Sequence, residues 1–253
     1  LGGRMAGKQR SEGRRAIMAQ IRLAGAIPRI DLAEKTGISR ATVTTITAEL
    51  LKSGLIDEVQ AENGAHDARR GRPKVDLRIR GAARLVAGAK ISQRSLSLVL
   101  LDFEGSQVAE YEAPLSVDAY VPEALADVML DAVAALTAKV DKTPSDVAGI
   151  GIGIAGIVDA TRGFVYWSPS LNVRNLEFGE VLSERLGIPT FLDNDVNLVA
   201  VAERSFGLGR DMSDFIVVTI EAGVGMGIVL GGELYRGTRG CGAELGLTKV
   251  QLE

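Results

Sequence analysis

The stretch that most limits what this chain can fold into is residues 31–54, which read DLAEKTGISRATVTTITAELLKSG. The pattern predicts two short helices joined by a tight turn, because Gly37 can adopt the positive φ angle that such a turn usually requires. Ser39 can then cap the second helix by accepting hydrogen bonds from N–H groups of its first turn. The apolar residues that recur at three- and four-residue spacing on one face of this helix are Val43, Ile46 and Leu50.

The opposite face of the second helix is short of the Glu and Lys side chains that usually cover an exposed helix. The residues expected there are Arg40, Ala41, Thr44, Thr45 and Thr47. One arginine among small side chains allows close approach to another surface, and a helix-turn-helix places such a helix in the major groove of DNA. The alternative is an ordinary helical hairpin with a threonine-rich face. The DNA contacts predicted from this helix are those of Ser39, Arg40, Thr42, Thr44 and Thr45.

The sequence on both sides of this stretch completes a winged helix-turn-helix. Residues 11–23 predict an amphipathic helix, which Gly25 ends. Residues 55–59 and 75–79 predict two strands of a hairpin, and three helices followed by such a hairpin form this domain type. We therefore predict a DNA-binding domain over residues 11–80.

The loop between the two strands carries four cations within six residues, RRGRPK. Its Arg-Gly-Arg-Pro core resembles an AT-hook, in which Gly lets the backbone run close to the groove floor and Pro keeps it extended. The flanking guanidinium groups can enter a narrow, strongly negative minor groove. The alternative is a solvated basic loop, and His66 in the same loop is expected to be exposed rather than a ligand. The minor-groove contacts predicted here are those of Arg69, Arg70, Arg72 and Lys74.

The distribution of charge separates the two parts of the chain. Residues 1–80 contain 16 Lys and Arg against 9 Asp and Glu, whereas the rest contains 13 against 23. Only the N-terminal part is therefore expected to meet a polyanion. The sequence contains no run of about 18 apolar residues, so no membrane-spanning helix is predicted. The single cysteine, Cys241, excludes an internal disulfide and fits a cytoplasmic location.

From residue 85 onward the pattern becomes that of an α/β protein. Strands are predicted at residues 85–91, 95–103, 107–115, 147–154, 190–192, 215–220 and 226–230. Helices are predicted at residues 121–140, 176–186 and 196–206. A group of strands followed by alternating helices and strands is typical of a layered α/β domain.

Three motifs in this part resemble the ROK family, which joins bacterial sugar kinases to transcriptional repressors that carry a winged helix-turn-helix ahead of a kinase-like domain. They are GIGIGIAGIVD at residues 149–159, DNDVN at residues 193–197 and GVGMG at residues 223–227. The resemblance covers nearly the whole chain from residue 11 and implies an actin/hexokinase-like, two-lobed sensor domain over residues 82–253. Compared with the family's repressors this domain ends early, so we expect it to be incomplete at its C-terminus. An exposed apolar surface there would need a partner chain.

Both phosphate loops of the family's kinases are altered. The first loop of the family resembles DIGGTK, whereas this chain has KISQRS at residues 90–95. The carboxylate that would bind the metal is therefore missing, and so are both glycines. The second loop usually begins Gly-Thr-Gly, and here it is EAG at residues 221–223, which would place a carboxylate against the phosphates. Two changes in one site argue against phosphoryl transfer, so we predict no catalytic residues and no cofactor.

The resemblance also implies a sugar site. Asp195 matches the aspartate that accepts the proton of the sugar hydroxyl in the kinases, and it can still accept a hydrogen bond from a sugar. It could also cap the helix expected to begin at Val196, a role that is compatible with ligand contact. Glu244 matches the sugar-binding glutamate. Leu247 stands where the family has a histidine that binds sugar and zinc, and Ser170 stands where it has an asparagine. No zinc motif follows. The predicted ligand residues are Gly156, Asn172, Asn194, Asp195 and Glu244, without a metal.

These features together favour a sequence-specific DNA-binding regulator of carbohydrate metabolism, acting as a repressor. We expect it to bind a double-stranded operator as a homodimer, with a sugar or sugar phosphate shifting the geometry of the paired DNA-binding domains. Two alternatives stay open. One is an ATP-dependent sugar kinase with a DNA-binding domain, and the other is a ROK domain that only dimerises or docks proteins without a small ligand.

Overall fold

The computed structural model describes residues 2–60, 75–116, 118–238, 240, 242, 243 and 245–247, with only the backbone described for residues 2–9 and 247. The chain divides into two compact units. Unit 1 is Leu1–Arg84 together with Asp102–Ser106, and unit 2 is Leu85–Leu101 together with Gln107–Glu253. The predicted domains, 11–80 and 82–253, are each continuous in sequence, whereas unit 1 also includes the short segment Asp102–Ser106, which interrupts unit 2. Within the part of the chain that the structure describes, no helix has the length and apolar character needed to cross a membrane.

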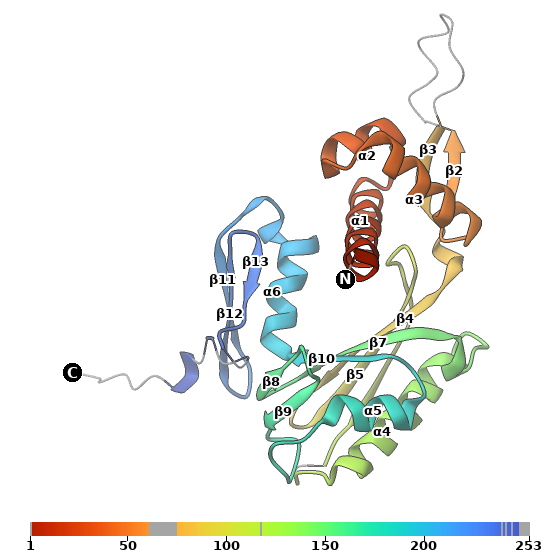
Figure 1. The fold of residues 1–253 in the computed structure, drawn as a ribbon. Coiled ribbons are helices and arrows are strands. Elements are labelled where there is room, and N and C mark those ends of the chain that lie inside the picture. The colour runs from red at the N-terminus through yellow and green to blue at the C-terminus, as the bar shows by residue number, and fades with distance from the viewer. Residues whose placement is uncertain are drawn as a thin grey trace, which may run out of the picture. The chain divides into compact units, whose positions relative to one another are not determined.

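Unit 1 is a three-helix domain with a small antiparallel sheet (Figure 1). Its helices are α1 (Gly2–Ala24), α2 (Arg29–Thr36) and α3 (Arg40–Lys52). Its strands are β1 (Ala26–Pro28), β2 (Ile56–Gln60) and β3 (Val75–Ile79), in the order β1-β3-β2. Helix α1 begins well before residue 11, and β1 was not predicted, because a three-residue strand is too short to show a period.

The predicted turn and cap of the helix-turn-helix are confirmed. Gly37 ends α2 with a φ of 67°, and the Ser39 side chain accepts a hydrogen bond from the Thr42 N–H at 3.2 Å. Thr47, however, is fully buried rather than exposed, so its predicted place on the outer face is wrong. It lies four residues after Val43 and three before Leu50, which is the spacing of the buried face. Its hydroxyl donates to the Thr44 carbonyl at 3.2 Å, so it is buried with a partner.

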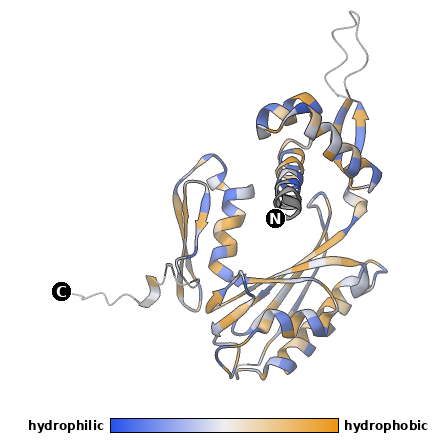
Figure 2. Ribbon diagram, in the orientation of Figure 1, coloured by the Kyte–Doolittle hydropathy of each residue, from blue (hydrophilic) through white to orange (hydrophobic). Residues whose placement is uncertain are grey.

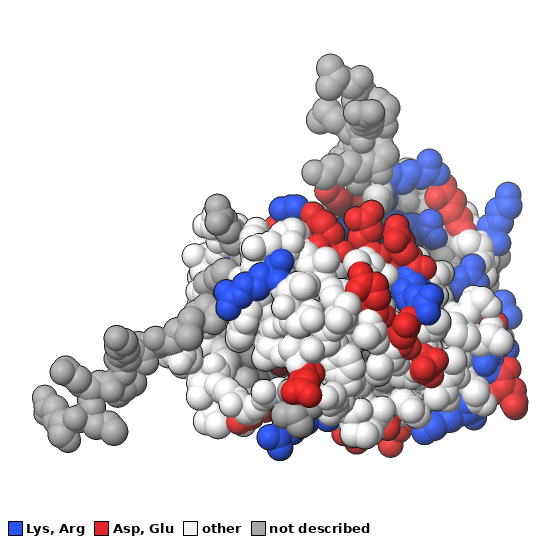
Figure 3. Space-filling view, turned by 90° about the horizontal axis from the view of Figure 1, so that it is seen from below, with Lys and Arg blue, Asp and Glu red and all other residues white. Residues whose placement is uncertain are grey.

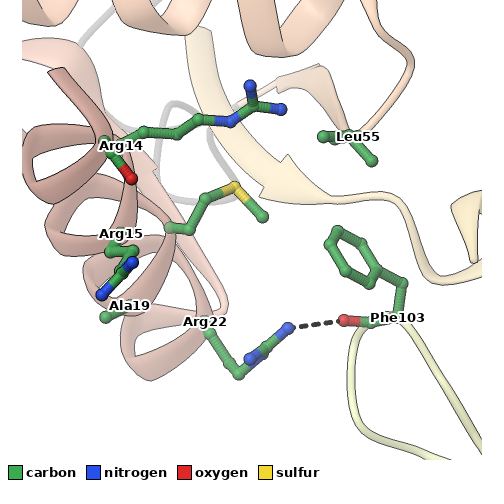
Figure 4. Close-up of a pocket in the computed structure, with 8 residues that line it drawn as sticks. Arg14, Arg15, Ala19, Arg22, Leu55 and Phe103 are labelled. Atoms are coloured by element: carbon green, nitrogen blue, oxygen red, sulfur yellow. Dashed lines mark hydrogen bonds between the residues drawn. The ribbon is translucent and has the colours of Figure 1, made fainter. Parts of the chain in front are cut away.

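The turn at Asp102–Ser106 packs against α1 within unit 1 (Figure 4). Arg22 donates from Nη2 to the carbonyl oxygen of Phe103 at 2.9 Å, and its guanidinium lies 5.7 Å from the centre of the Phe103 ring. The Phe103 N–H donates to the Gly81 carbonyl at 2.9 Å. Beside this contact lies an open pocket of about 400 Å³. Its lining residues are Ser11, Arg14, Arg15, Met18, Ala19, Arg22, Leu55 and Phe103.

Unit 2 is built on a five-stranded sheet in the order β10-β7-β4-β5-β6. These strands are β4 (Leu85–Ile91), β5 (Ser95–Asp102), β6 (Gln107–Pro114), β7 (Val147–Ile154) and β10 (Thr190–Asn194). Strands β10, β7 and β4 are parallel, and β5 and β6 form an antiparallel hairpin. Helices α4 (Pro122–Ala138) and α5 (Phe178–Leu186) cover one face, and α6 (Asp195–Phe206) lies on the other (Figure 1). Hydrophobic residues run along the central strands (Figure 2), whose side chains form the buried core with α4 and α5.

Two smaller pieces complete unit 2. A three-stranded antiparallel sheet packs on α6, and its strands are β11 (Phe215–Ile220), β12 (Val224–Leu230) and β13 (Glu233–Tyr235). The hairpin of β8 (Ile157–Asp159) and β9 (Phe164–Trp167) follows β7. Strands β8, β9 and β13 were not predicted. Alternate residues of β11 leave apolar side chains exposed on the face away from α6, namely Ile216, Val218 and Ile220.

The β8–β9 hairpin sits against the end of β7 because Gly156 has no side chain. Its φ is 127°, and a Cβ atom there would lie 2.1 Å from the Trp167 carbonyl oxygen. We expect Gly156→Ala to lower the free energy of unfolding by about 2–4 kcal/mol, since backbone strain and overlap add. Gly187→Ala is the matched control, because its φ is 63° with no heavy atom within 4 Å, and about 1 kcal/mol is expected. Urea unfolding measures both, and equal losses would contradict the packing argument.

Candidate DNA-binding and ligand-binding sites

The outer face of α3 presents the predicted DNA-binding side chains together. Ser39, Arg40, Thr42, Thr44 and Thr45 are all exposed. The Ser39 and Thr42 hydroxyl oxygens lie 2.9 Å apart, so the cap and the first turn share one small polar cluster. Among the described residues, no ion pair or hydrogen bond holds the Arg40 guanidinium. An unengaged guanidinium beside short side chains can reach a base edge or a phosphate.

The two exposed threonines in the middle of α3 already use their hydroxyl protons. Thr44 donates to the Arg40 carbonyl at 2.8 Å, and Thr45 donates to the Ala41 carbonyl at 3.1 Å. Each hydroxyl therefore remains only as an acceptor, and each side chain also offers a methyl group. In a major groove such side chains suit the N4 donor of cytosine, the N6 donor of adenine or the methyl group of thymine.

The predicted basic wing, with Arg69, Arg70, Arg72, Lys74 and His66, lies outside the described residues. Its two flanking strands, β2 and β3, are paired in register from Ile56 with Ile79 to Gln60 with Val75. These strands place the two ends of the loop side by side.

Charged side chains are unevenly distributed over the surface drawn in Figure 3. On the face seen in Figure 3, acidic side chains form a band with a few basic ones beside it, next to broad uncharged areas. In the sequence, residues 81–253 carry the excess of acidic side chains.

The candidate ligand site of unit 2 lies at the carboxyl ends of its parallel strands. Lys90 on β4 and Asp193 on β10 are both register partners of Gly153 on β7. Register partners in parallel strands project to the same face of a sheet. A Cβ atom on Gly153 would lie 3.5 Å from the Cβ of Asp195, so Asp195 stands over this glycine on that same face. The carboxyl edge of parallel strands is the common place for ligands in α/β folds.

The N-cap of α6 is Asn194, so the helix cap predicted for Asp195 is wrong. The Asn194 Oδ1 atom accepts from the N–H groups of Val196 at 2.9 Å and Asn197 at 3.1 Å. Its Nδ2 atom donates to the Gly156 carbonyl at 2.9 Å. The correction follows from the backbone, because α6 already begins at Asp195. Asn194 therefore links the start of α6 to the segment before β8.

Two charged groups, Lys90 and Glu221, lie close to Asp195. Lys90 donates from Nζ to Oε1 and Oε2 of Glu221, at 2.5 and 2.7 Å, across from the turn between β11 and β12. Burial raises the pKa of the Asp195 carboxyl above its ordinary value, and the charge of Glu221 adds to this rise. The charge of Lys90 and the hydrogen bond from Val196 N–H act in the opposite direction. The site thus holds a partly buried carboxylate close to an ion pair.

A second ion pair fixes the segment that follows β13. Asp193 is buried, and its Oδ2 atom accepts from Arg236 Nη2 at 2.7 Å and Nε at 3.2 Å. Its Oδ1 atom accepts from Asn197 Nδ2 at 3.1 Å and from the Asn194 N–H at 2.8 Å. Sequence analysis missed Arg236. A buried carboxylate needs a partner, but nothing in the sequence identifies which arginine supplies it.

The remaining predicted ligand residues are less closely joined. Asn172 is exposed, and its N–H donates to the Tyr120 carbonyl at 2.9 Å; no hydrogen bond among the described residues joins it to Asp195. Ser170 is buried, and its Oγ atom has no hydrogen-bond partner in the described part of the chain. Glu244 lies outside the described residues. Among those that are described, no cluster of His, Cys, Asp and Glu could hold a metal ion.

Two protein-family models match the chain. Residues 88–253 match the ROK family, and residues 12–57 match winged helix-turn-helix DNA-binding. The xylose repressor of Caldicellulosiruptor bescii is 27% identical over 227 residues, covering 90% of this chain and 56% of that protein. The chain therefore spans about half the length of the curated relatives it matches.

Solved structures include both regulators and kinases. A ROK family transcriptional regulator, a homolog of the E. coli MLC protein, matches with a TM-score of 0.75 at 25% identity, covering 96% of this chain and 60% of that one. A ROK family glucokinase from Streptomyces griseus, solved with glucose and AMPPNP, matches with a TM-score of 0.58 at 30% identity. It covers 66% of this chain and 51% of the kinase.

We expect Arg40→Ala to lower affinity for a specific DNA site by about 1–3 kcal/mol, and to lower affinity for random DNA by less. The reason is that a guanidinium that reads a base edge distinguishes sequences, whereas one that contacts phosphate does not. Binding titrations at fixed salt on both DNAs measure this, with Arg94→Ala, an exposed arginine of unit 2, as control. Equal losses on both DNAs would mean that Arg40 contacts only phosphate.

For the wing, we expect Arg72→Ala to weaken binding by about 1–3 kcal/mol and to reduce the preference for A·T-rich sequence beside the half-site. The expectation rests on the Arg-Gly-Arg-Pro sequence at residues 70–73. Titration against sites that differ only in their flanks is the measurement. Unchanged affinity together with an unchanged flank preference would exclude the wing from the interface.

Proposed function

The chain belongs to the ROK family, and from this premise we propose that it is a transcriptional repressor that binds a DNA operator and responds to a sugar. The predicted family and the predicted fold are confirmed, since a winged helix-turn-helix precedes a hexokinase-like α/β domain. The curated relative is named a repressor, and the structure of highest TM-score given above is that of a regulator. Operator binding as a homodimer, a sugar effector and a cytoplasmic location belong to the same proposal.

The observation that carries the DNA-binding part is the outer face of α3. It is exposed, it is short of acidic side chains, and its arginine is not engaged by the rest of the described structure. Val43, Ile46 and Leu50 hold its other face in the core of unit 1, so the helix presents these groups on a rigid support.

The observation that carries the sensor part is the ion pair of Lys90 and Glu221. These residues stand where the family's kinases have their phosphate loops, and each satisfies the other. A nucleotide phosphate would have to break this pair and then face the Glu221 carboxylate. Asp195 nevertheless keeps a carboxylate at the position that would meet a sugar hydroxyl. A site that retains its sugar acceptor and loses its phosphate cradle suits binding without transfer.

The second candidate function is a sugar kinase, and Asp195 is the observation that favours it. A partly buried aspartate with a raised pKa is the kind of general base that removes a hydroxyl proton. A coupled assay for ADP release, run with a panel of sugars, distinguishes the two functions. Sugar-dependent ADP release would overturn the proposal for unit 2, whatever unit 1 binds.

The test of the whole proposal starts from a random DNA pool. Sequences selected by the protein should share two half-sites separated by about one helical turn, roughly 10 base pairs, if it binds as a dimer. Affinity for the selected site is then measured with and without each sugar of the panel. A pool with no enriched sequence would contradict operator binding, and affinity that no sugar changes would contradict the sensor role.

We expect Asp195→Asn to cost about 1.5–3 kcal/mol of sugar affinity, the range for hydrogen bonds to a charged group. Folding should change little, because the cap of α6 comes from Asn194. Calorimetry on the wild type and the variant measures the loss, with Asp131→Asn, an exposed aspartate of α4, as control. Equal affinity in wild type and Asp195→Asn would remove Asp195 from the site.

The raised pKa of Asp195 also predicts a dependence on pH. The carboxylate must be ionised to accept fully from a sugar, so affinity should fall as the pH drops through the raised pKa, at a higher pH than for an ordinary aspartate. Stability should show the opposite sign, since a raised folded-state pKa favours the folded protein at low pH and the benefit is lost as the pH rises through that value. Both effects should be absent in Asp195→Asn.

A further inference from the structure

The charges around Asp195 bear on which ligand the site accepts. Lys90 and Arg236 are the cations that the described structure places there, and both are engaged. Lys90 contacts both carboxylate oxygens of Glu221, and Arg236 donates twice to Asp193. Among the described residues, the donors to the Asp195 carboxylate are backbone N–H groups, with that of Val196 at 3.0 Å. A ligand that approaches Asp195 therefore meets a carboxylate without a cationic partner of its own.

The fold keeps this arrangement in place. Gly153 has no side chain, so Asp195 can lie directly over the strand that separates it from Lys90. The turn that holds Glu221 is closed by a hydrogen bond from the Glu221 N–H to the Gly223 carbonyl at 2.9 Å. Lys90 is thus drawn toward the turn between β11 and β12 by two short hydrogen bonds.

This arrangement suits hydroxyl groups and opposes phosphates. A sugar hydroxyl can donate to the Asp195 carboxylate with no change in net charge. A phosphate ester, which carries up to two negative charges at neutral pH, needs uncommitted Arg, Lys or N–H donors. Here it would have to take Lys90 away from Glu221 and would then face the two carboxylates of Glu221 and Asp195.

We propose that the site selects an uncharged sugar over its phosphate ester, and that Glu221 sets this selection by occupying Lys90. The inference rests on the proposed sugar-sensing function and deepens it, because it names the chemical class of the effector. It also assigns the ion pair a role in specificity. Lys90 and Glu221 stand at positions of the two phosphate loops of the kinases, and the contact between them disfavours phosphate binding.

The test is calorimetry on the full chain at pH 7.5, with D-glucose and N-acetyl-D-glucosamine each compared with its 6-phosphate. For a sugar that binds, we expect at least tenfold tighter binding of the uncharged member. A phosphate that binds as tightly as its parent sugar, or more tightly, would overturn the inference and leave the sugar sensor standing. If neither member of either pair binds, and the wider sugar panel also fails, the sugar-sensing function and this inference fall together.

Glu221→Gln tests the residue itself. Freeing Lys90 and removing one negative charge should reduce the preference for the uncharged sugar about tenfold, mainly by tightening phosphate binding. Glu184→Gln is the matched control, since this exposed glutamate lies on α5, on the other face of the sheet (Figure 1). A merely structural role for Glu221 would lower the affinity for both ligands and leave their ratio unchanged. That result, with the wild type discriminating, would overturn the assignment of Glu221, and the unfolding midpoint shows whether each variant is folded.

Discussion

Unit 2 depends on how closely α6 approaches the two sheets on either side of it. A Cβ atom on Gly153 of β7 would lie 3.3 Å from the Cα of Asp195, and one on Gly225 of β12 would lie 2.4 Å from a methyl carbon of Val196. Larger residues at either glycine would push the start of α6 away, since side chains in a packed interior have little room to move. The charged and polar groups at that start therefore owe their position to two residues that have no side chain.

Elements with a strong period could be predicted from the sequence. The second helix of the helix-turn-helix and its cap at Ser39, the strands of the central sheet and the three helices of unit 2 all lie within a few residues of their predicted places. Each of them buries one continuous face, so its apolar residues recur at a regular spacing. The helix-turn-helix and the three motifs at residues 149–159, 193–197 and 223–227 were also enough to predict the family. Strands as short as β1 and β13 bury too little to leave such a pattern.

The parts of the site that could not be predicted all depend on contacts between distant segments. The Asp193 carboxylate is 43 residues from Arg236, and the Lys90 ammonium is 131 residues from Glu221. The sequence contains these residues without indicating that they pair, because the pairing follows from how the strands are ordered. The choice of Asn194 over Asp195 as the cap is a matter of a single residue in where β10 ends. Boundaries of this kind are set by packing and leave no local signal.

The ion pair of Lys90 and Glu221 is too exposed to explain by stability. The Lys90 side chain is 36% exposed and that of Glu221 is 53% exposed, and such pairs typically contribute about 0–1 kcal/mol. The effect proposed for this ion pair is on which ligand can enter the site around Asp195. A glycine-rich loop offers N–H groups to phosphate oxygens, whereas the Lys90 ammonium already donates to both carboxylate oxygens of Glu221, and that carboxylate adds a negative charge beside it. In the proposal made above, two side chains of opposite charge are therefore sufficient to change which ligand a kinase-like site accepts, while the Asp195 carboxylate and the strands beside it keep their places.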